Sequence, residues 1–289
     1  MPTRLPLLIA TASAVFFAVM ALAAKLAAAR LSGTEVAFMR FALMLLPLLA
    51  VPRLARQALT YQRLDLLVYR GVFGGTAVLL YFLALAHIPV GLATLLNYTS
   101  PVFSIAFASL FLGERADRRL LVPLAAALAG MALAAGGGHG AGPFLRFGPW
   151  EVVGIASAVL SGAALAAIRA ARRTESSWSI YGSLSVCGLL ATAPFALRGF
   201  QRPTPREWLL LLAMGICSMA AQLLITYAYR WVTNVQAGAI SQLTVVLSLL
   251  LGAVFVGDRL TPVQILGSAL TLGGVVGVVW LQATPRAVE

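Results

Sequence analysis

The side chains that could act chemically are mostly uncharged polar groups inside long apolar segments. Two stripes of them stand 144 residues apart, each with spacings of three and four, so on a helix each stripe occupies one face. They are Asn97, Ser100 and Ser104, and then Ser241, Thr244 and Ser248. Amides and hydroxyls at such positions bind a small polar ligand or join helices within a membrane. Because a lipid-facing amide would be costly, we expect at least Asn97 to point inward.

Six further side chains in the apolar segments are candidates to line the same pocket. They are Phe17, Tyr81, Tyr98, Ser157, Gln222 and Gln242. A phenol offers an apolar face and a hydrogen-bonding tip, which suits the side chain or the amine of an amino acid. For either tyrosine, simple packing is the alternative.

Pro101 predicts a kink in the segment that carries the first stripe. Proline has no backbone N–H and clashes with the preceding helical turn. The kink would either turn a carbonyl oxygen towards a ligand or only shape the packing. Val245 stands at the equivalent position of the second stripe, so the two stripes need not be chemically equivalent.

Two cations and one acid stand near the expected outer ends of the first two apolar segments. Lys25, Arg40 and Glu35 could neutralise one another while the long basic side chains extend to the interface. Alternatively they act in gating, by capturing a carboxylate near the outer mouth. The sequence leaves both interpretations open.

Residue types needed for catalysis or metal binding are not grouped anywhere in the chain. Lys25 is the only lysine and follows no glycine, which excludes a Walker A phosphate loop. Cys187 and Cys217 lie in apolar runs and fit neither a disulfide framework nor a metal site. We therefore expect no catalytic residues, no metal and no cofactor. A channel would need an acidic ring or a backbone filter motif, and neither is found.

The composition indicates that a lipid bilayer is the solvent of these segments. The 289 residues are 61% hydrophobic and 10% charged, with a mean hydropathy of +0.93. Soluble proteins carry about a quarter charged residues. A net charge of +12 would suggest nucleic acid in a soluble protein, but most basic residues separate apolar runs, so we expect no nucleic-acid partner.

Ten apolar runs are long enough to be read as membrane-spanning helices, each needing about 20 residues. They cover residues 5–29, 34–52, 64–86, 90–112, 120–137, 150–170, 177–197, 207–229, 235–256 and 262–281. The glycine-rich stretch 136–143 reads as a hinge between two groups of five. On helix ten, Gly273 and Gly277 form a G-x-x-x-G pair that predicts close helix packing.

The chain repeats itself at an offset of 144 residues, which predicts two halves, 1–144 and 145–289. Phe111 to Arg115 matches Phe255 to Arg259, and Gly130 matches Gly274. With five spans in each half, the second copy must enter the membrane from the opposite side. The sequence therefore predicts an all-α membrane protein of ten transmembrane helices, arranged as two inverted five-helix repeats around a central cavity. That architecture is typical of secondary transporters.

Arginines set the expected orientation. With the N-terminus inside, 13 arginines, Arg70 among them, fall on the cytoplasmic side and 6 on the outer side. The cluster Arg198, Arg202 and Arg206 runs against this bias. We expect a multi-pass protein of the plasma membrane (the bacterial inner membrane), with both termini cytoplasmic.

The whole chain resembles the EamA-type branch of the drug/metabolite transporter superfamily. The resemblance rests on the five-plus-five pattern, on Lys25, on Phe38-Met39-Arg40-Phe41, and on Pro101 followed by Gly113-Glu114-Arg115, which recurs as Gly257-Asp258-Arg259. It implies a ten-helix basket that exports small metabolites. Asn97-Tyr98 before Pro101 is similar to bacterial aromatic amino-acid exporters, which usually have Trp where Ser100 stands here.

These observations predict a secondary exporter of amino acids or related small metabolites. Its expected partners are a small-molecule substrate and the lipid bilayer, and we expect it to be monomeric. All nine acidic residues lie at span ends, in loops or in the tail, so we expect facilitated transport or exchange. The alternatives are a carrier for another metabolite or an organic-cation drug, with or without proton coupling. Outside transport, they are an intramembrane enzyme or a channel.

Overall fold

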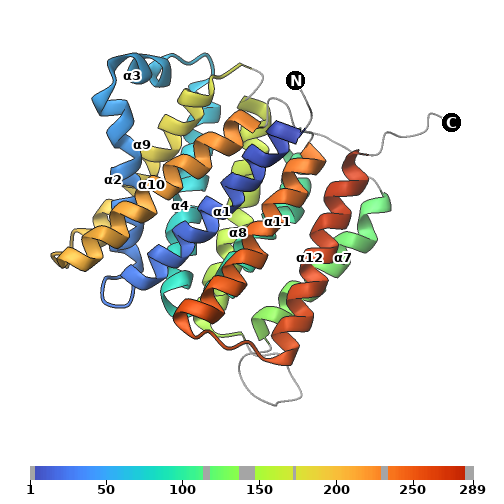
Figure 1. Ribbon diagram of the computed structural model, residues 1–289. Helices are drawn as coiled ribbons and strands as arrows, with labels where there is room; N and C mark the ends of the chain where they lie inside the picture. The colour runs from blue at the N-terminus through green and yellow to red at the C-terminus, as the bar shows by residue number, and fades with distance from the viewer. Residues whose placement is uncertain (1–3, 113–117, 137–146, 172–173, 229–233, 284–289) are drawn as a thin grey trace.

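The computed structural model describes residues 4–112, 118–136, 147–171, 174–228 and 234–283, and within these ranges the chain forms helices and turns without a strand (Figure 1). The elements are α1 (Arg4–Ala27), α2 (Gly33–Ala50), α3 (Pro52–Leu59), α4 (Leu64–His87), α5 (Val90–Tyr98), α6 (Ser100–Leu112), the 3-10 turn η1 (Arg118–Leu120), α7 (Leu121–Gly136), α8 (Pro149–Ala171), α9 (Ser177–Ala196), α10 (Pro205–Ala228), α11 (Asn234–Leu251), the π-helical turn η2 (Gly252–Val256) and α12 (Pro262–Ala283). The predicted signature 113–115 and the glycine-rich residues 137–143 lie outside the described residues.

Six of the described helices are long and apolar enough to cross a membrane. They contain the segments Leu8–Ala27, Gly33–Ala50, Leu64–His87, Pro149–Ile168, Ser177–Ala196 and Pro205–Ile225. Three shorter apolar helical segments accompany them, Leu121–Ala135, Ile240–Val256 and Pro262–Gly277. The all-helical membrane protein predicted from the composition is therefore confirmed.

The fourth predicted span is interrupted in the middle of the bundle. It consists of α5 and α6, which are separated at Thr99, two residues before Pro101. Proline cannot donate the backbone hydrogen bond that would continue the helix across this point. The Thr99 N–H instead bonds the Leu96 carbonyl at 3.2 Å, and the Thr99 hydroxyl donates to the Leu95 carbonyl at 2.9 Å.

A short helix that the span analysis does not predict lies between α2 and α4. Pro52 begins α3 at a position where a proline costs no hydrogen bond, and Arg53 and Arg56 project from this helix. No residue of α3 is buried. We call the end of the bundle where α1 begins and α3 lies the N-terminal face, and the other end the opposite face (Figure 1).

Helices α7 and α12, which the offset of 144 residues relates, lie side by side and run antiparallel (Figure 1). Pro123, near the start of α7, lies against Gly274 near the end of α12. Ala134, near the end of α7, lies against Gly267 near the start of α12. Two copies of one element in opposite directions are the arrangement expected of an inverted repeat.

The other helix contacts also come in pairs that the same offset exchanges. Helix α1 packs on α10 as α8 packs on α4, and α1 packs on α11 as α8 packs on α5 and α6. In the contacts α2–α9 and α5–α11, the offset maps each helix onto its own partner. The two predicted halves are thus interleaved, and the first helix of each packs mainly against helices of the other.

The predicted G-x-x-x-G pair is correct for Gly277 and wrong for Gly273. Gly273 is exposed, and a Cβ placed on it would meet no atom within 4 Å. The other glycines in the α7–α12 contact are Gly130, Gly267 and Gly274, where a Cβ would meet backbone atoms of the facing helix. A Cβ on Gly277 would lie 3.1 Å from the Pro123 Cβ of α7. The motif indicates that small residues are present, but the facing helix decides which of them are in the contact.

Apolar packing is concentrated towards the opposite face. One cluster of buried side chains fills the helix halves nearer that face. It includes Phe82 and Leu85 of α4, Val90 and Leu95 of α5, and Met214 of α10. The helix halves near the N-terminal face enclose the cavity described next.

Candidate binding cavity

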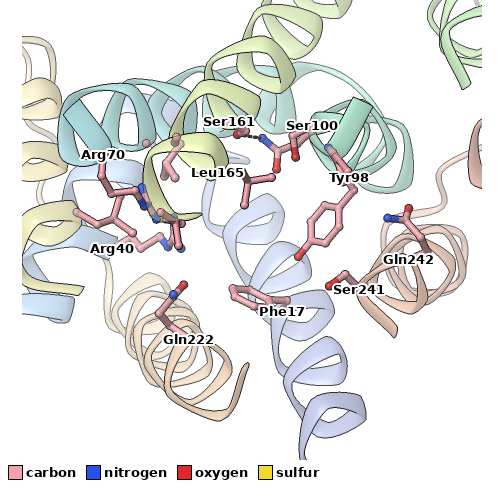
Figure 2. A pocket seen from close by; sticks show the side chains of 17 residues that line it. Phe17, Arg40, Arg70, Tyr98, Ser100, Ser161, Leu165, Gln222, Ser241 and Gln242 are labelled. Carbon is pink, nitrogen blue, oxygen red and sulfur yellow. Dashed lines mark hydrogen bonds between the residues drawn. The ribbon is translucent and has the colours of Figure 1, made fainter. Parts of the chain in front are cut away.

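A cavity of about 260 Å³ lies near the middle of the bundle (Figure 2). Its lining comes from both predicted halves of the chain: Phe17, Arg40, Arg70, Gly74, Val78, Asn97, Tyr98, Ser100, Pro101, Ser161, Ala164, Leu165, Ile168, Leu184, Gln222, Ser241 and Gln242. Most of these residues belong to helix halves on the side of the N-terminal face, such as the first half of α4 and the second half of α8. None of the described lining residues is acidic.

The structure brings nine residues of the sequence-based site together at this cavity. They are Phe17, Arg40, Asn97, Tyr98, Ser100, Pro101, Gln222, Ser241 and Gln242. The break at Thr99 places the end of α5 and the start of α6 in the lining, so a ligand would meet Asn97 and Ser100 at an interrupted helix.

The other candidates lie outside the lining. Tyr81 is buried, and its hydroxyl shares a 3.1 Å hydrogen bond with Thr94. Ser104, Thr244 and Ser248 are buried between helices, and their hydroxyls find no hydrogen-bond partner among the described residues. Because periodicity gives a helix face and not its neighbour, it does not separate a lining serine from a packed one.

Asn97 joins the two halves at the edge of the cavity. Its side-chain amide donates to the hydroxyl of Ser157 at 2.6 Å. It also donates to the hydroxyl of Ser161 at 3.1 Å, the bond drawn as a dashed line in Figure 2, and both serines belong to α8. The structure therefore places Ser157 behind the lining as a partner of Asn97, while Ser161 itself lines the cavity. Asn97 therefore points into the bundle, as expected, where it contacts α8 and lines the cavity.

Arg40 lies deeper than the sequence predicts. It stands in the middle of α2, is 5% exposed, and donates from Nε to the Ser218 hydroxyl of α10 at 2.8 Å. Its guanidinium also lies over the rings of Phe41 and Phe82, 5.6 and 5.5 Å from their centres. Lys25 and Glu35 are not its partners, because its position along α2 places it away from the opposite face, where those two residues lie.

Arg70 is a site residue that the sequence reasoning missed. The arginine count assigned it to the cytoplasmic side, but it lies within α4, is 7% exposed and lines the cavity. Its Nε finds no hydrogen-bond partner among the described residues. A signal was available, since Arg70 falls inside the predicted span 64–86 with glycine one turn later at Gly74. Without Arg70 the cytoplasmic arginines still outnumber the outer ones.

Lys25 and Glu35 bond to backbone groups at the opposite face and not to each other. The Lys25 ammonium donates to the carbonyls of Ile88 at 2.8 Å and of Ala86 at 3.3 Å. Glu35 accepts from the Ser32 N–H at 2.7 Å, completing a capping box at the start of α2. The predicted mutual neutralisation of Lys25, Arg40 and Glu35 is therefore replaced by separate partners.

Three carboxylates join the two predicted halves at the opposite face. Glu207 of α10 accepts a two-point hydrogen bond from Arg30, which raises the pKa of the Arg30 guanidinium. Glu35 accepts from the Gln201 N–H at 2.5 Å. Asp258 accepts from the Val90 N–H at 2.7 Å and so caps α5, which has no side-chain cap of its own. These contacts link the two predicted halves at the face away from the cavity.

Comparisons with known proteins agree with this architecture. The EamA-like transporter family matches residues 4–136 and again 148–280. The protein named Pseudopaline exporter CntI of Pseudomonas aeruginosa is 35% identical over 175 residues, 60% of each chain. A probable terminal-alkyne amino-acid exporter of Streptantibioticus cattleyicolor is 28% identical over 195 residues, 65% of this chain and 64% of that protein. The chain thus aligns with somewhat under two thirds of the length of these two relatives. A solved crystal structure with 22% identity covers 96% of both chains with a TM-score of 0.63, which shows the same fold.

Proposed function

This chain belongs to the EamA-like transporter family, and from that premise we propose that it is a secondary exporter of amino acids or related small metabolites across the plasma membrane. The observation that carries the proposal is the cavity, whose lining comes from both halves and from an interrupted helix. Carriers of this kind hold substrate near the bilayer midplane at the interface of two repeats, where broken helices expose backbone groups. The relative named as an amino-acid exporter supports the substrate class.

Ten transmembrane helices in two inverted repeats are the proposed frame of transport. The fourth and ninth are α5 with α6 and α11 with η2, and α3 and η1 lie outside the count. The antiparallel pair α7–α12 and the exchanged helix contacts support the inversion. In such a frame each half can adopt the other's conformation, so that one site opens alternately to the two sides.

The described conformation is proposed to load substrate from the cytoplasm. The cavity is displaced towards the N-terminal face, which the arginine count assigns to the cytoplasm, and α3 contributes exposed arginines there. On the opposite face the apolar cluster and the three bridging carboxylates oppose opening. Export would then require these contacts to separate while the helix halves near the N-terminal face come together.

The residues that line the cavity are compatible with transport driven by exchange or by the substrate's own gradient. Proton-driven carriers use a titratable group whose protonation controls the cycle, and the described lining contains neither an acidic residue nor a histidine. The cycle would then be driven by solute binding.

Flux in proteoliposomes tests the function directly. Purified protein is reconstituted, loaded with one unlabelled amino acid at a time, and supplied with a trace of the same labelled amino acid outside. Saturable uptake that increases with internal unlabelled solute is expected for at least one member of the panel. Protein-free liposomes are the control. Equal, unsaturable flux of every solute would indicate a channel, and absence of any protein-dependent flux would contradict transport of this class.

A further inference from the structure

The cavity contains two buried guanidinium groups without a counter-ion. Arg40 and Arg70 are 5% and 7% exposed, and the ion pairs found among the described residues involve only Arg30 with Glu207 and Arg63 with Asp65. The two side chains lie on the same side of the cavity and repel each other electrostatically (Figure 2). Burying an unpaired charge is costly, and two like charges together increase the cost.

Gly74 leaves room for the guanidinium of Arg70 at the cavity. A Cβ on Gly74 would collide with Arg70 Nη1, so the absence of a side chain at this position leaves the space that the guanidinium occupies. Arg70 donates no hydrogen bond to any described residue, and its Nε is buried without a partner. Arg40 uses Nε for Ser218, and no described group accepts from its two terminal nitrogens. The terminal N–H groups of both guanidinium groups thus have no described protein acceptor at this end of the cavity.

The remainder of the lining has a different character. Figure 2 shows Tyr98 and Ser241 across the cavity from the two arginines, with Phe17 below Tyr98 in this view. These side chains offer aromatic surface and hydroxyl groups. A ligand that fits this lining would direct its anionic groups to the two arginines and place its uncharged carbon skeleton against the other side chains.

We propose that Arg40 and Arg70 form a subsite for the carboxylate groups of the substrate, so that this carrier selects anionic metabolites, dicarboxylates above all, over uncharged and cationic ones. The proposal rests on the proposed function, because it names the substrate class of the same cavity. Guanidinium groups bind carboxylates in bidentate, charge-assisted pairs. With two cations and no acid in the described lining, an organic cation would be repelled.

Binding measured on the purified full-length protein tests the subsite without depending on transport. Thermal unfolding in detergent and phosphate-free buffer is followed with glutarate, its uncharged analogue glutaramide, inorganic phosphate, and the cation tetraphenylphosphonium. A ligand that binds the folded state raises the melting temperature, and at one concentration a tighter ligand raises it more. Glutarate is expected to stabilise the wild type, and glutaramide and tetraphenylphosphonium are expected to have no effect.

Variants then assign the effect to the arginines. Arg70→Gln should weaken glutarate binding about tenfold or more, and Arg70→Lys should recover part of it because the charge is kept and the fork is lost. Gly74→Ala should weaken it too, because Arg70 must move although its charge remains. Arg53→Gln, which removes an exposed arginine of α3, is the matched control and should bind as the wild type does. If Arg70→Gln fails to fold, Arg70→Lys and Gly74→Ala carry the test.

The outcomes separate this proposal from the proposed function. Equal binding of glutarate and glutaramide, no binding of glutarate at tens of millimolar, or unchanged binding in the Arg70 and Gly74 variants would overturn the subsite. Stabilisation by phosphate and not by glutarate would overturn its assignment to carboxylates. Arginine-dependent glutarate binding without flux of any solute would retain the subsite and contradict transport. Flux of uncharged solutes that is unchanged in Arg70→Gln would support transport and contradict the carboxylate subsite.

Discussion

Asn97 and Ser157, 60 positions apart in the chain, are joined by a 2.6 Å hydrogen bond between the side-chain amide and the hydroxyl. The bond connects the last turn of α5, just before the break at Thr99, with α8 of the second half. It couples the interrupted helix to α8, whose second half also lines the cavity. A change in the distance between α5 and α8 would therefore change the shape of the cavity.

Replacing Asn97 with alanine should impair both stability and transport. The variant loses two donated hydrogen bonds and leaves the hydroxyls of Ser157 and Ser161 without that donor, which should cost about 1–3 kcal/mol. Ser183→Ala is the matched control, because that hydroxyl bonds within α9 and does not line the cavity. Melting temperature and proteoliposome flux are measured on both. Equal values for the two variants would refute the role given to Asn97.

Neighbouring glycines of α12 should respond oppositely to the same substitution. A Cβ on Gly274 would lie 2.5 Å from the Ala127 backbone nitrogen, so Gly274→Ala forces α7 and α12 apart and should destabilise by about 1–3 kcal/mol. Gly273→Ala meets open space and should leave the unfolding transition unchanged or raise it. Thermal unfolding of both variants in the same detergent decides the matter. A larger loss in Gly273→Ala would mean that α12 is rotated from the described packing.

Thiol labelling should reveal opposite sides for two exposed loops. In a protein with Cys187 and Cys217 replaced by alanine, Tyr61→Cys introduces a thiol between α3 and α4, and Gly199→Cys one between α9 and α10. An impermeant maleimide applied to intact cells should modify only the cysteine at position 199. Modification of position 61 alone would invert the proposed orientation, and modification of both from outside would contradict the topology.

Removing the Asp258 carboxylate should loosen the closed opposite face. Asp258→Ala takes away the cap of α5, which is an interaction of about 0.5–2 kcal/mol. A thiol introduced as Ala93→Cys, at a fully buried position of α5, should then react faster with maleimide than it does with Asp258 present. Asp65→Ala, which removes an acid near the N-terminal face, is the control. If both acid variants change the rate equally, Asp258 has no specific part in the closure.

Transport should continue without a pH gradient. Because the described lining contains no carboxylate or imidazole, label should enter preloaded proteoliposomes by exchange at equal pH on both sides. An imposed gradient should not concentrate a solute without net charge. Accumulation above equilibrium under the gradient alone would establish proton coupling and point to a titrating group outside the lining.

The solvent of this protein and most of its spans follow from local composition. A backbone in hydrocarbon must satisfy its hydrogen bonds within each helix, so apolar length alone is informative, as in Leu64–His87. The break near Pro101 is also local, because proline removes a donor wherever it stands. The family is recognisable for the same reason: its pattern lies in spans and repeated motifs along the chain.

Which polar side chains meet at the cavity depended on the tertiary structure. Ser100 and Ser104 belong to one predicted stripe, yet Ser100 lines the cavity and Ser104 is buried between helices, since lining depends on the neighbouring helix as well as on the face. Arg70 resembles any arginine at a span end until the start of α4 is placed beside α8 and α9 and Gly74 leaves room for its guanidinium. Gly273 and Gly274 differ only in the direction they face. Such properties belong to pairs of helices, and a single sequence carries no record of how far two helices approach or at what depth they cross.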